Sequence, residues 1–551
     1  MSADHRISAG TVPVIYSVGR QPELVQMASR LRETLGWQPV CWITQPELEE
    51  VVARAFPHAM RLDFSAINRS AFDERLRDVP AMDSTKLIGS GLLFRQALAV
   101  VSRHVLGRSM SADQQVDYLL ERFAHASRIV NLHRPGRFVM NATPHSVADF
   151  CLYAACKLSG VSMRFVHLTG FRGIQVLLDD PQRLPLGLDR VGDAATLSAA
   201  GEAELAQLRD KQRDQTPWYL ARQNDEDGKF ARHDAEADRV VRAGLLEPGS
   251  TSFDRSVAQA LNMREASGEQ GAALATNSPF HRRFQPKHHE PMRRSFSIGS
   301  EGFSGPMPSW AQYYTYRDYA HLDKRRWKAR YQYLAAGFDA EELERHPTAF
   351  FAMHYQPERT TVPEGGVFAD QLETLRKLSQ WLPYGWRLAV KEHPSQFKWQ
   401  TEGELGRWDG YHEAIAALDK VCLVPLDVDG TALVDRCAVT VTVTGTVGWE
   451  AALRGRPAIA LANPWFAGPG VVLHARDRDS FRQALRAVQN GWAPSDDAIR
   501  AHLAGIEAVG VRGFMNPSHA PLYEDLDEAK NAQALASLFE KVEALSVRER
   551  P

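Results

Sequence analysis

Three short segments in the second half of the chain place chemically active side chains directly after apolar runs. They are residues 354–361 (HYQPERTT), 391–396 (KEHPSQ) and 444–450 (TGTVGWE). Each apolar run predicts a β-strand, and in open α/β sheets ligands bind outside the carboxyl ends of the strands. The order of these segments therefore predicts a polar site built from three loops at one edge of a sheet.

The third segment has the composition of a phosphate-binding turn. Thr444, Gly445 and Thr446 follow a β-branched run and precede an apolar helical pattern. Backbone N–H groups at a helix start, with two hydroxyls beside them, suit a phosphate. Glu450, one turn later, is placed to accept hydrogen bonds from ribose hydroxyls. The alternative is an ordinary strand–helix unit in which a threonine caps the helix.

The second segment places an ammonium and an imidazole at the end of its predicted strand. His393 can bond a phosphate oxygen and, when protonated, can neutralise charge on a departing nucleotide. We predict a catalytic and nucleotide-binding role for His393, with Lys391 nearby in the same nucleotide site. The alternative is that His393 is only a turn residue before Pro394.

The first segment and the residues just after it carry two carboxylates. A carboxylate in this loop can act as a nucleophile or as the electrostatic partner of an oxocarbenium-like centre. Glu358 and Glu364 both fit that role, and a solvated loop charge is the alternative. Gln356 and Arg359 stand close to Glu358 and are predicted to contact the substrate.

The N-terminal half repeats the order of strand, polar turn and helix at residues 141–149 (NATPHSVAD). Here His145 or Asp149 is placed to contact an acceptor hydroxyl, one of them as a base, and His145 is our catalytic candidate. The alternative is a capped helix in which Ser146 or Thr143 is the cap.

The elements that must position these residues alternate between strands and helices. In the first half, strands are predicted at 12–17, 38–43, 138–141 and 163–168, and helices at 23–35 and 147–158. In the second half, a helix is predicted at 313–337, strands at 348–355, 387–391, 421–424, 438–443 and 458–461, and a last amphipathic helix at 525–545. This alternation predicts an α/β protein with two Rossmann-like halves. Gly19 and Arg20, after the first strand, are predicted to face the cleft between the halves and to contact substrate.

The composition is that of an ordinary globular protein. A chain of 551 residues exceeds what one core usually fills, and a net charge of -2 argues against a dedicated nucleic-acid binder. No signal peptide and no apolar run of about 18 residues is visible, so we expect a cytoplasmic protein without a transmembrane segment. Neither the cysteines nor the His, Asp and Glu residues show metal-ligand spacing, so we expect no metal.

Taken in this order, the three segments resemble bacterial capsule and surface-polysaccharide biosynthesis proteins. That group includes the retaining β-Kdo transferases, which have GT-B folds and use CMP-activated ulosonic acid donors. The His-Pro pair followed by a hydroxyl-rich turn is also similar to bacterial sialyltransferases, which use CMP-sialic acid. The resemblance spans residues 348–470 and is only architectural elsewhere. It implies a nucleotide-sugar donor, CMP-linked, as substrate, with no cofactor.

The resemblance also implies roles for single residues. His393 matches the histidine near the CMP phosphate, and residues 444–446 match the hydroxyl-bearing phosphate turn. In the Kdo transferases a carboxylate follows a Gln after the first strand of the C-terminal domain, which makes Glu358 the candidate nucleophile. The chain departs from that family in having Glu rather than Asp here, and from the sialyltransferases in lacking their N-terminal acidic-acidic-Gly motif.

We therefore expect the GT-B architecture, with two Rossmann-like domains facing a cleft and a C-terminal helix that packs back toward the N-terminal domain. The expected parts are an acceptor-side domain at 1–310 with a helical insertion at about 196–310, a helical linker at 311–346, a nucleotide-sugar-binding domain at 347–520, and a closing helix at 521–551. Within the insertion, residues 278–309 are predicted to form a long loop, either a solvated linker or a basic rim.

The expected function is transfer of a CMP-activated ulosonic acid, such as Kdo or a sialic-acid-like sugar, onto a bacterial surface glycan. The glycan acceptor can be lipid-linked, in which case the protein would work at the inner face of the inner membrane. One rival keeps the fold and changes the reaction to a nucleotide-sugar epimerase or hydrolase. A second rival is a non-catalytic scaffold of the polysaccharide assembly machinery.

Overall fold

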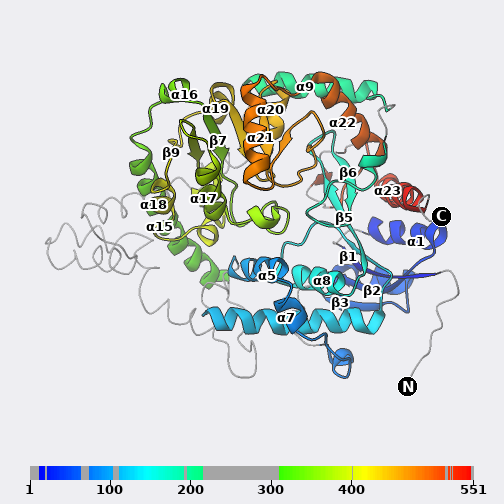
Figure 1. The fold of residues 1–551 in the computed structure, drawn as a ribbon. Helices are drawn as coiled ribbons and strands as arrows, with labels where there is room; N and C mark the ends of the chain where they lie inside the picture. Colours follow the sequence, from blue (N-terminus) through cyan, green and yellow to red (C-terminus); the bar gives the residue numbers. More distant parts are fainter. Residues whose placement is uncertain are drawn as a thin grey trace, which may run out of the picture.

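The computed structural model contains two α/β units, each built on one sheet (Figure 1). It describes residues 11–547 except for 19–21, 64–66, 68–72, 104–110, 192–194, 215–309, 400, 516–518, 521–522 and 524. Within these described ranges, no helix is long and apolar enough to cross a membrane.

The N-terminal sheet has seven strands in the order β13-β6-β5-β4-β1-β2-β3. Their bounds are β1 Val12–Ser17, β2 Trp37–Thr44, β3 Met60–Asp63, β4 Arg137–Met140, β5 Ser162–Leu168, β6 Ile174–Leu178 and β13 Val511–Arg512. β1 to β5 pair in parallel, whereas β6 runs antiparallel to both β5 and β13. The parallel part has the strand order of a Rossmann half.

The C-terminal sheet has six parallel strands in the order β12-β11-β10-β7-β8-β9. Their bounds are β7 Thr348–Ala352, β8 Arg387–Lys391, β9 Val421–Leu423, β10 Val439–Thr442, β11 Ala458–Ala460 and β12 Leu473–His474. The chain fills the sheet outward from β7 to one edge and then outward from β10 to the other. The boundary between β7 and β10 is therefore the topological switch point, where doubly wound sheets bind their ligands.

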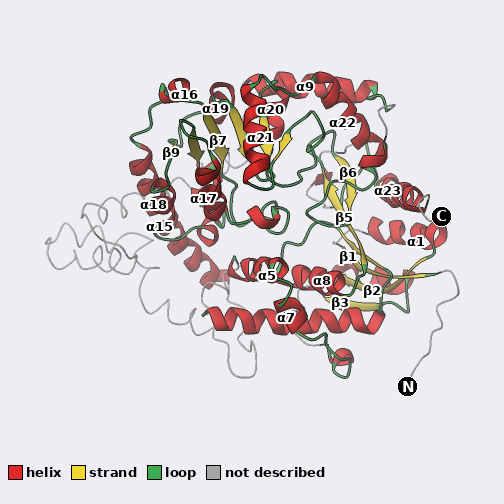
Figure 2. Ribbon diagram, viewed as in Figure 1, coloured by secondary structure: helices red, strands yellow, loops and turns green. Residues whose placement is uncertain are grey.

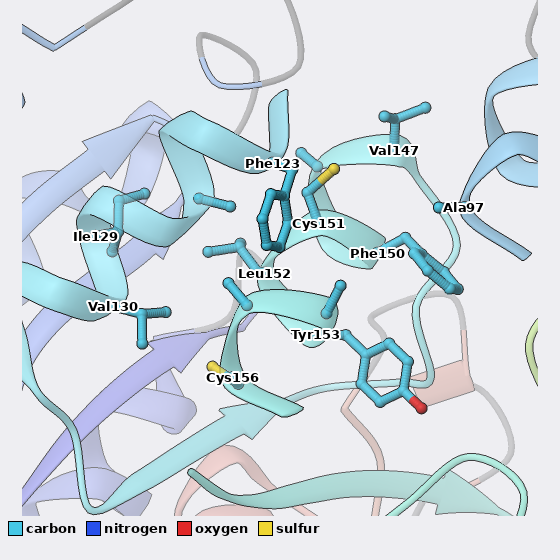
Figure 3. Packing of buried hydrophobic residues seen from close by; sticks show 14 of the residues in the cluster. Ala97, Phe123, Ile129, Val130, Val147, Phe150, Cys151, Leu152, Tyr153 and Cys156 are labelled. Atoms are coloured by element: carbon cyan, nitrogen blue, oxygen red, sulfur yellow. The ribbon is translucent and has the colours of Figure 1, made fainter. Parts of the chain in front are cut away.

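Helices cover both faces of the N-terminal sheet (Figure 2). Those of this unit are α1 Glu23–Leu35, α2 Glu49–Ala55, α4 Thr85–Ile88, α5 Leu92–Ser102, α7 Ala112–His133 and α8 Val147–Leu158. Strand side chains alternate between faces, so Ile15 of β1 packs with α5, α7 and α8, while Val14 and Tyr16 pack with α1. Figure 3 shows the first of these cores, where Phe123 of α7 lies beside Leu152 of α8.

The C-terminal sheet is enclosed in the same way. Its helices are α9 Ala199–Asp214, α15 Trp310–Ala335, α16 Glu342–Arg345, α17 Gln371–Trp381, α18 Tyr411–Ala416, α19 Gly430–Arg436, α20 Val447–Leu453, α21 Arg478–Gln489 and α22 Asp496–Val509. Phe351 of β7 packs with α15, α17 and α21, and Phe350 packs with α19, α20 and α22. Short 3-10 turns, among them η5 Gly366–Phe368 and η6 Pro394–Phe397, follow the strand ends.

The last helix, α23 (Glu528–Val547), returns to the N-terminal unit and packs against α1. Arg30 Nε of α1 lies 2.9 Å from Glu540 Oε1, and Arg137 of β4 lies 3.0 Å from Glu543 Oε2. Trp37 of β2 makes an edge contact with Phe539. The predicted return of the C-terminal helix is confirmed, and so is the predicted fold class of two Rossmann-like domains.

The chain rejoins the N-terminal sheet at β13, earlier than the predicted boundary at residue 520. A two-residue strand shows no periodicity, so the sequence pattern does not reveal it. The predicted loop at 278–309 and the insertion beyond residue 214 lie outside the described residues.

Candidate functional site

The switch point of the C-terminal sheet is occupied by a histidine and a turn. His354 follows β7, and its Nε2 accepts a hydrogen bond of 3.4 Å from the amide of Thr444, which follows β10. The hydroxyl of Thr442 lies 3.5 Å from the same Nε2. A Cβ on Gly445 would come within 2.8 Å of that hydroxyl and 3.3 Å of the His354 ring, so only glycine fits there. The turn 444–446 therefore rests directly on His354.

Two of the turn's amides are used inside the protein, contrary to the expectation that they are free for a phosphate. The amide of Thr444 binds His354, and the amide of Gly445 donates to Thr442 Oγ1 at 2.8 Å. The Thr444 hydroxyl donates to the carbonyl of Thr360 at 2.5 Å. Thr446 is exposed, and its hydroxyl donates to Glu450 Oε1 at 3.2 Å. Thr446 is thus the member of the turn that faces outward.

His393 lies at the end of β8, on the other side of β7 from the turn. Its Nδ1 accepts a hydrogen bond of 3.2 Å from the amide of Ser395, which leaves the ring proton on Nε2. Burial lowers the pKa of His393 to about 4. Around neutral pH His393 is therefore an uncharged hydrogen-bond donor, which can bond a phosphate oxygen but carries no charge to neutralise a departing nucleotide.

The imidazoles of His354 and His393 lie close together. Burial lowers the pKa of His354 to about 3, and the charge of His393 contributes to that shift. The ring of Tyr355 stands 6.2 Å from the ring of His393. The structure thus brings the turn 444–446 and His393 to the same end of the sheet, with His354 between them.

A buried ion pair fixes the backbone at this end of β8. Glu392 accepts two hydrogen bonds from Arg407, at 2.7 and 2.9 Å, and its Oε2 lies 3.0 Å from His412 Nε2. The amide of His393 also donates to Glu392, at 2.8 Å. Burial alone would raise the pKa of Glu392, but the charge of Arg407 and these hydrogen bonds hold it well below its ordinary value. Glu392 therefore carries a charge and anchors the turn that presents His393.

Three glutamine amides tie the loops together. Gln371 of α17 accepts from the amide of His354 at 2.7 Å and donates to the carbonyl of the same residue at 3.0 Å. Gln396 Oε1 accepts from the amide of Gln356 at 2.9 Å, and Gln396 Nε2 donates to the Gln356 carbonyl at 3.0 Å. The side chain of Gln356 donates to the hydroxyl of Thr361. Gln356, predicted to contact substrate, thus braces its own loop.

Lys391 is directed to the loop after β9. Its Nζ donates to the carbonyl of Leu426 at 3.0 Å, and burial lowers its pKa. The charges of Asp429 and Asp427 oppose that shift. The ammonium group is therefore already engaged within the C-terminal unit.

The loop after β7 reaches across to the N-terminal unit. Arg103, at the end of α5, donates to the carbonyls of Val362 at 2.9 Å, Glu358 at 3.3 Å and His145 at 2.5 Å. Gln96 of α5 donates to the carbonyl of Pro363 at 3.1 Å. One guanidinium thus joins the carboxylate-bearing loop of one unit to the β4–α8 turn of the other.

The two candidate carboxyl groups have different surroundings. Glu358 is half-buried, and its Oε1 accepts a hydrogen bond of 2.9 Å from the amide of Arg359. Glu364 is buried, and its Oε1 accepts a 2.5 Å hydrogen bond from the hydroxyl of Thr143 in the N-terminal unit. Burial raises the pKa of Glu364 to about 7. Glu364 can therefore gain or lose a proton near neutral pH.

The turn after β4 is a capped helix start, as the alternative interpretation predicts. Ser146 and Asp149 form a capping box, in which the Asp149 carboxylate accepts from the Ser146 amide at 3.1 Å and hydroxyl at 2.9 Å. His145 lies just before the cap, where burial lowers its pKa to about 4. Gly19 and Arg20 lie outside the described residues.

A cavity of about 290 Å³ lies at the carboxyl ends of β2 and β3 in the N-terminal unit. Its lining includes polar side chains of both charge signs, among them Gln45, Asp63 and Arg61. Asp73 and Arg75, which also line it, form an ion pair of 2.6 Å. Side chains of this kind hydrogen-bond to hydroxyl groups, and none of them was singled out from the sequence.

The raised pKa of Glu364 predicts a pH-dependent stability. Its pKa is about 7 in the folded protein against 4.5 for an ordinary Glu, so the folded state binds the extra proton between these values. Stability therefore falls as pH rises from 4.5 to 7, by about 3 kcal/mol. Glu364→Gln cannot ionise and should gain about that much over the wild type by pH 8.

Urea unfolding at pH 5 and at pH 8 measures this gain. Glu373→Gln serves as the control, because Glu373 is an exposed carboxylate on α17. A difference between Glu364→Gln and the wild type that stays constant with pH would contradict the assigned pKa.

Part of the chain matches the model of one protein family. Residues 359–495 match the family model described as capsule polysaccharide biosynthesis protein. This stretch contains the KEHPSQ and TGTVGWE segments whole, and it begins within the HYQPERTT segment. The resemblance to capsule polysaccharide biosynthesis proteins is thereby confirmed for this part of the chain. No curated protein matches the chain.

Solved structures similar to the chain include transferases and epimerases. The Thermosulfurimonas dismutans KpsC β-Kdo 2,7 transferase is 16% identical over 35% of this chain and 57% of its own, with a TM-score of 0.19. The β-Kdo 2,4 transferase of the same KpsC is 11% identical over 66% and 78%, with a TM-score of 0.24. The UDP-GlcNAc 2-epimerase of Neisseria meningitidis is 10% identical over 97% and 99%, with a TM-score of 0.19. The chain thus spans little more than half of the first of these, and the reaction is inferred from the site.

Several residues of the site were missed from the sequence. His354 lies in the first segment but has no role among the predictions, although its place directly after the central strand points to the site. No sequence pattern points to the other missed residues, because each hydrogen-bonds to a residue far away in the sequence. They are Arg407, Gln371 and Arg103.

Proposed function

We propose that the chain is a glycosyltransferase that moves a CMP-activated ulosonic acid onto a bacterial surface glycan. The observation that carries the proposal is the convergence of three loop segments at the switch point, where the ring of His354 lies between the turn 444–446 and His393. The match of residues 359–495 to the capsule polysaccharide family supports it. So does the loop with Glu358 and Glu364, which contacts the N-terminal unit.

The nucleotide phosphate is proposed to lie between His393 and Thr446. The Nε2–H of neutral His393 donates to a phosphate oxygen. The outward Thr446 hydroxyl, which donates to Glu450 in the structure, rotates to donate to another phosphate oxygen. Hydrogen bonds that strengthen as negative charge develops on the leaving nucleotide lower the barrier to bond cleavage. Glu450, whose pKa is raised by burial, is proposed to accept from the ribose hydroxyls.

The two carboxyl groups are proposed to act on the sugar and on the acceptor. Glu358 stabilises or attacks the anomeric carbon once the nucleotide departs. Glu364 takes the proton of the acceptor hydroxyl, for which a pKa of about 7 is well matched. His145 lies across the same contact, with its carbonyl on Arg103, and is proposed to bind the acceptor.

Incubation with CMP-Kdo, with and without a capsular glycan acceptor, tests the proposal. Formation of a glycosylated acceptor together with CMP supports it. Rapid epimerisation of UDP-GlcNAc in the absence of acceptor would instead show an epimerase. No binding of CMP, UDP or GDP in a calorimetric titration would favour the non-catalytic scaffold.

The proposed reaction uses no metal ion, because the protein's own hydrogen-bond donors receive the leaving phosphate. We therefore expect EDTA to leave the rate of transfer unchanged. Product formation measured before and after dialysis against EDTA checks this. A lost rate that Mg²⁺ or Mn²⁺ restores would contradict it.

A further inference from the structure

Four basic side chains from separate segments converge where the two units meet. His145 follows β4, His167 lies near the carboxyl end of β5, and His519 follows β13. β4 and β5 run in parallel, and β13 runs in the same direction because β6 is antiparallel to both β5 and β13. His145 and His167 are therefore carried to one edge of the N-terminal sheet, and His519 lies near enough for the charge of Arg359 to act on it. Arg359, from the C-terminal unit, is the fourth member.

Arg359 is held against that edge by its neighbours. Arg103 donates both to the carbonyl of Glu358, the preceding residue, and to the carbonyl of His145. The carbonyl of Arg359 accepts a 3.2 Å hydrogen bond from the amide of Glu364, whose side chain binds Thr143 beside His145. Backbone and side-chain contacts on both sides thus fix the position of Arg359.

The positive charge of Arg359 lowers the pKa of all three histidines. Burial is the first cause that lowers the pKa of His145, His167 and His519, and the charge of Arg359 lowers each further. Glu364 also senses Arg359, but a carboxyl with a pKa of about 7 is only partly ionised near neutral pH.

Two polar groups of this cluster have no hydrogen-bond partner in the described part of the chain. Nδ1 of His167 is buried and has no hydrogen-bond partner in the described part of the chain. The guanidinium of half-buried Arg359 likewise makes no hydrogen bond or ion pair within the described ranges. A guanidinium on a held backbone, near uncharged imidazoles and with unused polar atoms, is suited to an anion with several acceptor oxygens.

We infer that Arg359, together with His167 and His519, binds the carboxylate of the transferred sugar, next to the acceptor-side residue His145. This inference rests on the proposed function, which places Glu358 at the anomeric carbon. In an ulosonic acid the carboxylate is bonded to that same carbon, so the residue next to Glu358 is the one placed to meet it. Arg binds carboxylates through two parallel hydrogen bonds, and the imidazoles supply further N–H donors. The phosphate, in contrast, is assigned to His393 and Thr446.

Calorimetric titrations of the full chain test this inference with four probes: CMP-Kdo, CMP, free Kdo and the C1 amide of Kdo. Arg359→Gln should weaken binding of CMP-Kdo and free Kdo about 10- to 100-fold, because hydrogen bonds to a charged group are lost. Binding of CMP and of the amide should be unchanged. Arg359→Lys should recover part of the loss. Arg376→Gln, which removes an exposed guanidinium of α17, is the matched control and should bind all probes as the wild type does.

The outcomes separate this inference from the proposed function. Equal affinity of wild type and Arg359→Gln for CMP-Kdo would overturn the carboxylate site while leaving the transferase intact. An equal loss for CMP and CMP-Kdo would overturn it too, since Arg359 would then bind the phosphate. A wild type that ignores CMP but binds free Kdo through Arg359 would support the carboxylate site and refute the nucleotide donor. Binding of none of the four probes would refute both.

Discussion

Glu358→Gln should abolish glycosyl transfer, lowering kcat by about 1,000-fold or more, as expected for loss of a group that acts on the reacting carbon. Gln has nearly the same shape and keeps an oxygen for the Arg359 amide, the one hydrogen bond that the Glu358 side chain accepts in the described structure. The fold should therefore survive the change. Release of CMP from CMP-Kdo in the presence of acceptor measures the rate.

Two further variants make that result specific. Glu373→Gln removes an exposed carboxylate on α17 and should retain full activity. Glu364→Gln should lower the rate by about 100- to 10,000-fold, because it removes an acid–base group while the sugar-side carboxylate stays in place. If Glu358→Gln keeps full activity and Glu364→Gln loses all activity, Glu364 rather than Glu358 acts at the anomeric carbon.

The second large effect concerns stability rather than chemistry. Arg407→Met should destabilise the protein by about 3–5 kcal/mol, because it leaves the buried carboxylate of Glu392 without its main partner. His412 and the amide of His393 still contact Glu392, but they do not replace the bidentate guanidinium. Urea unfolding of the purified variant at pH 7 measures the loss.

A double variant separates the lost ion pair from lost packing. Arg407→Met combined with Glu392→Gln removes both charges, so it should recover much of the stability that the single variant loses. Arg376→Met with Glu373→Gln removes an exposed ion pair and should change stability by less than about 1 kcal/mol. If the double variant at Arg407 and Glu392 is as unstable as the single one, the buried charge is not the cause.

Long apolar runs made much of the fold predictable. β1, β8, α1 and α8 have the predicted bounds, since each joins a clear periodicity to a clear start or stop. The short strands β3, β12 and β13 were missed because two to four residues carry no periodicity. The long helix α7 was also missed. Its start could have been predicted, because Ser111 and Gln114 have the spacing of a capping box, which they form in the structure.

The candidate site was predictable to the level of loops but not of contacts. Strand ends meet at one edge of a parallel sheet, so the turn 444–446 and His393 were expected to lie near one another. The contacts that hold them involve partners distant in sequence, such as Arg407 for Glu392 and Arg103 for the carboxylate loop. Burial decides the charge state of His393 and Glu364, and no spacing rule gives burial of a loop residue.

The central claim is that the anionic leaving group lies between His393 and the turn 444–446. A crystal of the protein soaked with CMP tests it most directly. We predict the phosphate within about 3 Å of His393 Nε2 and of the Thr446 hydroxyl. CMP found elsewhere, for example in the cavity at the ends of β2 and β3, or UDP bound at this turn when CMP is not, would contradict the account.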